Sequence, residues 1–241
     1  MRDKTVKKII FFASGSGTNV ENIIKYFHGN MAVEITLVQT NNPNSGVLIR
    51  AEKLNKPIML FSKRELQDQS LLKKIITINP DLIILAGFLL KIPKEFVKAF
   101  PKRIINIHPA LLPKFGGKGM YGSRVHQSVK DAGEQITGIT IHLVNEYFDQ
   151  GEIIFQASVD VASQDSVDEI ANKVHKLEYT YYPKLINKLL FFTFKGRKLA
   201  NFYFKRDSKK YFLPIRSVSL EPVSIYLKEK VLIFNIITRW H

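Results

Sequence analysis

The sequence of 241 residues contains no cysteine. This absence excludes disulfides, thiolate metal sites and cysteine nucleophiles, and it fits a reducing compartment, so we expect a cytoplasmic protein. Acidic residues are also scarce, because 21 Asp and Glu stand against 36 Lys and Arg, a formal net charge of +15. Such an excess of positive charge favours anionic ligands, nucleic acid or an acidic membrane surface as partners.

Long hydrophobic runs are absent as well. No stretch approaches about 18 consecutive apolar residues, so the sequence predicts no transmembrane helix and no membrane partner. The N-terminus, MRDKTVKKIIFFASGSG, is basic and then apolar, like the start of a signal peptide. Its apolar run covers only residues 9–13 and leads into a Gly-rich turn, which is more typical of a first β-strand.

Short β-branched and aromatic runs alternate with segments of helical periodicity over the first 109 residues. The expected strands are 7–14, 32–40, 56–62, 81–88 and 103–109. The expected helices are 18–29, 45–55, 64–79 and 93–100. This alternation predicts an α/β, Rossmann-like fold with a mostly parallel sheet covered by helices on both faces. Ligands of such sheets bind beyond the carboxyl ends of the strands.

The pattern changes after residue 109. Residues 113–124 contain four glycines and are expected to form a loop. A helix at 124–133, strands at 136–145 and 151–161, and a long helix at 166–192 are expected to follow. We therefore divide the chain into a domain, 1–192, and a basic C-terminal appendage, 193–241. Residues 191–241 carry 11 Lys and Arg against 3 Asp and Glu.

The first candidate site is ASGSGTN, residues 13–19, between an expected strand and an expected helix. Glycines there allow backbone N–H groups to approach an anion, and the helix N-terminus adds favourable partial charge. The spacing matches neither the Rossmann nor the Walker A pattern. The segment is therefore interpreted either as a phosphate-binding loop or as a tight turn with a capping Thr18.

The second candidate site is the strand end NIHPALLPKF, residues 106–115. Alternation along a strand puts Asn106 and His108 on one face. An amide beside an imidazole can stabilise a developing oxyanion, although a hydrogen-bonded structural strand end is the alternative. Asp149 follows in an expected turn and matters only if it folds back onto His108, where it would orient the imidazole.

The remaining histidines show no pairwise metal-ligand spacing. We therefore predict no metal and expect surface or hydrogen-bonded core positions for His28, His126, His142, His175 and His241.

Four segments together resemble the glycinamide ribonucleotide formyltransferases, which are folate-dependent enzymes of purine biosynthesis. SGSGTN, PDLIILAGF, NIHPALLPKF and DQGEIIFQ occur in that family's order and approximate spacing, over about residues 7–192. The resemblance implies the formyltransferase fold and transfer of a formyl group from 10-formyltetrahydrofolate to the amine of glycinamide ribonucleotide, both small molecules.

The resemblance also implies roles for individual residues. Asn106, His108 and Asp149 match the catalytic trio, in which Asp149 raises the pKa of His108. Glu178 matches an acidic helix residue that holds the substrate's amino end. The segment that holds the ribose phosphate corresponds to Gly15, Ser16, Gly17, Thr18 and Asn19. The folate site corresponds to Arg64, Leu89, Leu90, Lys91, Ile92 and Asn106.

Three features depart from the family pattern. The tail from about residue 193 has no counterpart in it. Leu90 stands where relatives commonly have Arg, so this contact to folate would be apolar or through the backbone. The loop at 115–124 is longer than in the shortest relatives, which indicates either a mobile lid or a longer surface loop.

Other formyl-folate enzymes are rival interpretations. Methionyl-tRNA formyltransferases share the Asn-His-Asp core, but they usually carry Arg-Gly-Ala where this chain has Phe115-Gly116-Gly117. A formyltetrahydrofolate deformylase would need a further N-terminal domain. A rival of another class is a non-catalytic nucleotide- or nucleic-acid-binding module, because NFYFKRDSKKYF in the tail interleaves basic and aromatic residues. We expect an extension without a nucleic-acid partner, and the sequence leaves the oligomeric state open.

Overall fold

The computed structural model describes residues 6–191, and the appendage expected at 193–241 lies outside this range. One seven-stranded sheet has the order β3-β2-β1-β4-β5-β6-β7. The strands are β1 Lys7–Phe12, β2 Val33–Thr40, β3 Ile58–Leu60, β4 Leu82–Leu85, β5 Ile104–His108, β6 Ile136–Leu143 and β7 Ile153–Asp160. Each neighbouring pair of strands from β3 to β5 in this order is parallel, and the pairs β5–β6 and β6–β7 are antiparallel. The expected mostly parallel sheet is therefore confirmed.

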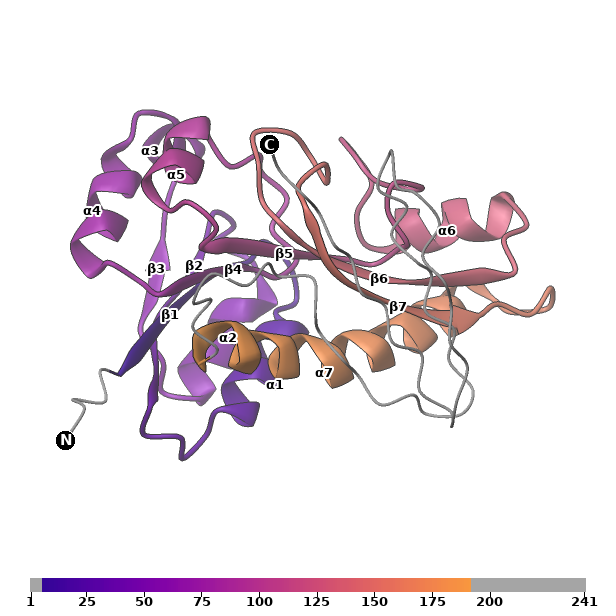
Figure 1. The fold of residues 1–241 in the computed structure, drawn as a ribbon, viewed down its shortest axis with the longest axis horizontal. Coiled ribbons are helices and arrows are strands. Elements are labelled where there is room, and N and C mark those ends of the chain that lie inside the picture. Colours follow the sequence, from indigo (N-terminus) through magenta and orange to yellow (C-terminus); the bar gives the residue numbers. More distant parts are fainter. Residues whose placement is uncertain (1–5, 192–241) are drawn as a thin grey trace, which may run out of the picture.

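Helices cover both faces of this sheet (Figure 1). They are α1 Thr18–Tyr26, α2 Gly46–Lys53, α3 Lys63–Gln67, α4 Ser70–Ile78, α5 Lys94–Ala99, α6 Ser123–Asp131 and α7 Val167–Phe191. One apolar core lies between the sheet and α1, α2 and α7, and the other between the sheet and α3, α4 and α5. α6 packs against α7.

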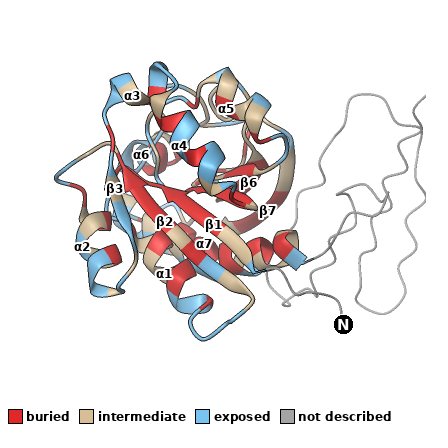
Figure 2. Cartoon of the chain, turned by 90° about the vertical axis from the view of Figure 1, so that its left-hand side faces the viewer, coloured by how far each residue is buried: buried red, intermediate tan, exposed pale blue. Residues whose placement is uncertain are grey.

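The central strands are apolar on both faces because each face meets a core. Along β1, Ile9 and Phe11 enter one core, while Ile10 and Phe12 enter the other. All four side chains are fully buried, and Figure 2 shows β1 and β2 as mainly buried strands, while the outer surfaces of the helices are exposed.

The strand order reverses at β1. The chain runs from β1 outward through β2 to β3, and then returns to β4 on the other side of β1. The connections that leave β1 and β4 therefore diverge to opposite sides and open a crevice at the carboxyl edge of the sheet.

One expected helix, 64–79, is wrong as drawn from the sequence, because the structure breaks it into α3 and α4. Gln69 has a φ of +65° in the left-handed region, and the Asp68 carboxylate accepts from the N–H of Ser70. Ser62 and Glu65 form a capping box at the start of α3. The break contains neither Gly nor Pro, so the apolar periodicity continues across it without a signal.

α7 contains Pro183 in its interior. Proline has no N–H, so the carbonyl of Tyr179, four residues earlier, loses its helical donor. The side chain of Asn22 in α1 donates to that carbonyl at 3.0 Å. This hydrogen bond joins α1 to α7 at the point where the helix cannot satisfy its own backbone.

Candidate active site

A cavity of about 810 Å³ opens at the carboxyl edge of the sheet, at the reversal point. Its walls come from the segments that follow β1, β4 and β5, namely 15–19, 86–91 and 106–109, together with the loop 117–122 and Glu178 of α7. The sequence placed candidate residues at these three strand ends, and the structure brings them into one cavity.

Asn106 and His108 both line this cavity from β5. The neighbouring strand β6 places His142 opposite Asn106 and Thr140 opposite His108. The Asn106 amide nitrogen lies 3.1 Å from Nε2 of His142 and 3.3 Å from Oδ1 of Asp149. Both residues of the expected pair therefore face the same side of the sheet.

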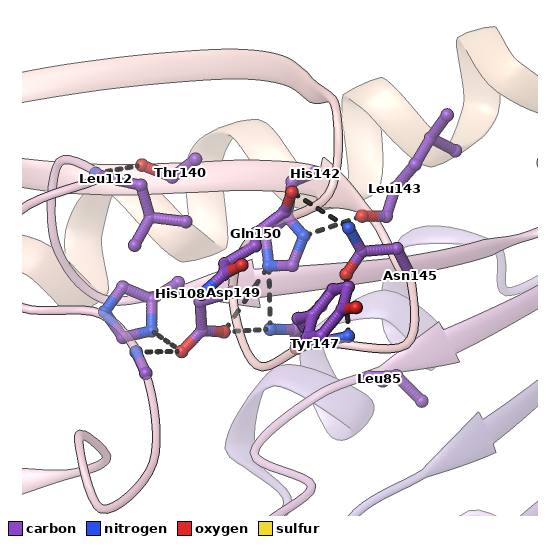
Figure 3. Close-up of polar contacts among 12 residues, drawn as sticks. Leu85, His108, Leu112, Thr140, His142, Leu143, Asn145, Tyr147, Asp149 and Gln150 are labelled. Atoms are coloured by element: carbon purple, nitrogen blue, oxygen red, sulfur yellow. Dashed lines mark hydrogen bonds and ion pairs between the residues drawn. The ribbon is translucent and has the colours of Figure 1, made fainter. Parts of the chain in front are cut away.

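Asp149 folds back onto β5 and lies between two imidazoles (Figure 3). Its Oδ2 is 3.5 Å from Nδ1 of His108, and its Oδ1 is 3.6 Å from Nε2 of His142. The backbone N–H of Gly117 donates to Oδ2 at 3.0 Å. The Gly-rich loop thus holds the carboxylate in place through this hydrogen bond. The loop packs closely here, because an added Cβ at Gly116 would lie 2.4 Å from a methyl group of Leu112.

The contacts of His108 define where it carries a proton. Its Nε2 lies 2.8 Å from the carbonyl oxygen of Phe115, which can only accept, so Nε2–H donates. In the neutral ring, Nδ1 therefore has no proton and faces the carboxylate of Asp149. Burial lowers the pKa of His108, and the charge of Asp149, which acts to raise it, offsets burial only in part. The resemblance predicted the direction of the Asp149 effect correctly, but burial outweighs it.

Asp149 has a pKa below its ordinary value. Burial acts to raise this pKa, but the contacts with His142, with His108 and with the Gly117 N–H together outweigh it. Asp149 is thus ionised at neutral pH beside a neutral imidazole, an arrangement in which a proton arriving at His108 Nδ1 is stabilised by the carboxylate.

The loop at 15–19 has a conformation that requires glycine. Gly17 has a φ of +79°, and an added Cβ would lie 2.6 Å from three atoms of Val47. Thr18 is the first residue of α1 and does not cap it, because Gly17 holds the N-cap position and has no side chain. α1 therefore begins without a side-chain cap, which leaves its N-terminus for an anion.

Glu178 joins this loop to α7. Its Oε2 accepts from the Asn19 amide at 3.0 Å and lies 2.9 Å from Nδ1 of His175. Glu178 is only 4% exposed, and the hydrogen bond to its carboxylate raises the pKa of His175. The predicted ribonucleotide residues 15–19 and Glu178 are thus brought together at one end of the cavity.

The residues predicted for folate divide into two groups. Leu89, Leu90 and Lys91 line the cavity, whereas Ile92 is buried in the core beneath α5. Arg64 does not line the cavity: its side chain is 91% exposed and lies 3.8 Å from Asp68. Its position gives no support to a folate contact, and other residues of the same segment line the wall, namely Lys63, Leu66 and Gln67.

Three of the histidines expected at the surface or in the core lie at or beside the site. His142 contacts Asn106 and Asp149, and it is hydrogen-bonded and buried, as a core histidine would be. His126 and His175 line the cavity with their rings 6.1 Å apart. The register of β6 against β5 brings His142 into place, and a single sequence carries no signal for that register. His28 is exposed as expected, and His241 lies outside the described residues.

Within residues 6–191, no group of three or more His, Asp or Glu side chains could hold a metal ion. The helices of this range also include none that is long and apolar enough to cross a membrane.

The fold and site define an α/β protein with an amide, an imidazole and a carboxylate converging in a cavity where the strand order reverses. The chain belongs to the formyl transferase family, whose profile matches residues 7–186.

Several relatives carry the same name. The chloroplastic phosphoribosylglycinamide formyltransferase of Arabidopsis thaliana is 38% identical over 190 residues, covering 76% of this chain and 65% of the relative. The Bacillus subtilis phosphoribosylglycinamide formyltransferase is 33% identical over 199 residues, covering 80% of this chain and all of the relative. A related protein of Vigna unguiculata is covered over 61% of its length. The chain thus spans less than two thirds of the two plant relatives.

Solved structures show the same likeness. The phosphoribosylglycinamide formyltransferase of Bacillus halodurans superposes with a TM-score of 0.69 at 31% identity, covering 77% of this chain and 96% of that chain. The Coxiella burnetii protein of that name gives 0.69 at 34% identity, covering 77% and 87%.

Proposed function

We propose that this chain transfers the formyl group of 10-formyltetrahydrofolate to the amine of glycinamide ribonucleotide. The observation that carries the proposal is the convergence of Asn106, His108 and Asp149 in a cavity that the Gly-rich loop 15–19 also lines. Membership of the formyl transferase family and relatives named phosphoribosylglycinamide formyltransferase support it. A chain without cysteine suits a reducing cytosol, which we propose as its location.

The ribonucleotide is assigned to the loop end of the cavity. Its phosphate would lie on residues 15–19 at the uncapped start of α1, where backbone N–H groups and the helix dipole favour an anion. Its amino end would lie near the buried carboxylate of Glu178, which Asn19 and His175 hold in place.

The formyl-folate is assigned to the wall formed by Leu89, Leu90 and Lys91. Leu90 and the neighbouring Leu66 and Phe88 offer apolar surface to a planar ring system, while backbone groups offer hydrogen bonds. The cavity volume of about 810 Å³ lies within the range of small-molecule sites and leaves room for two substrates to meet at β5.

At β5, the amine attacks the formyl carbon and a tetrahedral intermediate forms. Asn106 N–H and, once Nδ1 is protonated, the imidazolium of His108 stabilise the oxyanion, and each donor lowers the barrier by roughly 2.7–4 kcal/mol. The new C–N bond forms as the bond from the formyl carbon to the folate nitrogen breaks. The proton lost by the amine passes to His108 Nδ1, where Asp149 stabilises the imidazolium. The imidazolium then gives this proton to the leaving folate nitrogen and returns to the neutral ring.

Purified protein tests this proposal with three acceptors offered separately: glycinamide ribonucleotide, methionyl-tRNA and water. We expect rapid formylation of the ribonucleotide, with no formyl-methionyl-tRNA and only slow release of formate. Folded protein that formylates methionyl-tRNA instead would replace this function with the rival formyl-folate activity. Protein inactive toward all three acceptors would exclude formyl transfer.

A further inference from the structure

Ser14 is the last residue before the Gly-rich loop, and it contacts the loops that follow β2 and β4. Its hydroxyl accepts from the backbone N–H of Leu89 at 3.1 Å and donates to Oδ1 of Asn41 at 2.7 Å. Its N–H donates to the carbonyl of Gly87 at 2.9 Å, and its carbonyl accepts from the Asn42 amide at 3.2 Å. Every polar group of this residue is therefore engaged.

These bonds join segments that belong to different substrates under the proposed function. Gly15 begins the loop assigned to the ribonucleotide, and Leu89 begins the wall assigned to folate. The two segments diverge from the reversal point, between β1 and β4, so no regular strand pairing holds them together beyond Gly87. The hydrogen bond from the Leu89 N–H to the Ser14 hydroxyl therefore links the folate wall to the residue that precedes the ribonucleotide loop.

Ser14 itself touches neither substrate site. It is 5% exposed and is not among the residues that line the cavity, and neither is its partner Asn41. The hydroxyl hydrogen can serve only one acceptor, and Asn41 takes it at 2.7 Å, so the oxygen lone pairs remain directed to Leu89 N–H. Asn41 thereby orients the hydroxyl that holds the folate wall.

We propose that Ser14 is a positioning residue that sets the spacing between the formyl donor and the amine acceptor. This inference rests on the proposed function, because it takes the two assignments from there. Without the hydroxyl, every atom that lines the cavity remains, so each substrate keeps its own contacts. The relative placement of the two substrates is lost, and placement acts on turnover more than on binding.

The test compares Ser14→Ala with the matched control Ser45→Ala. Ser45 is equally buried, at 4% exposure, and its hydroxyl donates at 3.1 Å to Thr40, the last residue of β2. Neither Ser45 nor Thr40 lines the cavity. We expect Ser14→Ala to lower kcat on the order of tenfold while each KM changes less than about threefold. Ser45→Ala should keep the kcat of the unmodified protein, even if it lowers the melting temperature as much as Ser14→Ala does.

A Ser14→Ala protein with unchanged kcat, or a Ser45→Ala protein with the same loss, would overturn the inference. If Ser14→Ala does not fold, Asn41→Ala removes only the acceptor of the hydroxyl and should lower kcat in the same direction by a smaller factor, and an unchanged kcat there overturns the inference equally. An unmodified protein that transfers no formyl group overturns the proposed function and this inference together. An active protein whose kcat is unchanged by Ser14→Ala overturns this inference alone.

Discussion

His108 and Asp149 are a coupled pair whose burial and charge act in opposite directions. Burial favours the neutral imidazole, and the carboxylate 3.5 Å away favours the protonated one. The folded pKa of His108 lies below its ordinary value of about 6.5, so the ring is neutral at pH 7 and protonates as the pH falls through that lower value. Under the proposed function, this neutral ring beside an ionised carboxylate accepts the proton that the attacking amine loses.

Asp149→Asn should lower the pKa of His108 further. The carboxylate is the largest contribution that raises this pKa, so its removal leaves burial opposed only by the smaller effects of the Phe115 hydrogen bond and the Glu178 charge. NMR titration of the His108 ring should show a midpoint below about 6.5 in the unmodified protein and a lower midpoint in Asp149→Asn. A midpoint that stays in place or rises would contradict the ion-pair geometry.

Part of the site could be predicted residue by residue from the sequence. Period-two geometry placed Asn106 and His108 on one face, and the glycines at 15 and 17 marked the turn after β1. His142 could not be predicted in this way, because it reaches the site through the register of an antiparallel pair. Arg64 was expected at the folate site from the family resemblance alone, and the structure places its side chain near Asp68 and in solvent.

At the scale of elements, the β1–α1 connection depends on one glycine. Gly17→Ala places a Cβ at a positive φ and 2.6 Å from Val47, so it should lower the free energy of unfolding by about 1–3 kcal/mol. Gly15→Ala is the matched control, because an added Cβ there has no atom within 4 Å. Urea unfolding of both variants measures the difference. Equal stabilities would contradict the packing of this loop against α2.

The contact between α1 and α7 can be tested with Pro183. Asn22→Ala should lower the free energy of unfolding by about 1 kcal/mol, because the Tyr179 carbonyl loses its donor. In a Pro183→Ala background the new N–H can donate to Tyr179, so the cost of Asn22→Ala should shrink toward zero. A double-mutant cycle by urea unfolding measures this. The same cost in both backgrounds would contradict the inference that the Asn22 hydrogen bond replaces the missing helical hydrogen bond.

The elements themselves were largely predictable, since fully apolar strands and amphipathic helices carry strong periodicity. The division of 64–79 was not, because Gln69 adopts a left-handed conformation that nothing in its residue type requires. The long helix was expected through its interior proline, and the structure shows how α1 compensates for the missing donor.

At the scale of the molecule, the strand order determines where the parts of the site meet. β1, β4 and β5 are neighbours, although β1 and β5 are nearly a hundred residues apart in the chain, and their carboxyl ends open into the same cavity. Strand–helix alternation predicts such a sheet and such an edge. It does not predict strand order or register, which tertiary packing decides. The expectation that the loop, the strand end and Asp149 form one site came from the family resemblance.

The central claim is that the formyl carbon moves from folate to the ribonucleotide amine at Asn106 and His108. Carbon-13 in the formyl group of 10-formyltetrahydrofolate allows NMR to follow that atom directly. We predict that the label appears as a formamide on glycinamide ribonucleotide, and that His108→Ala slows its appearance on the order of a hundredfold while the protein stays folded. Label that stays on folate, that leaves only as formate, or that moves as quickly with His108→Ala would contradict this account.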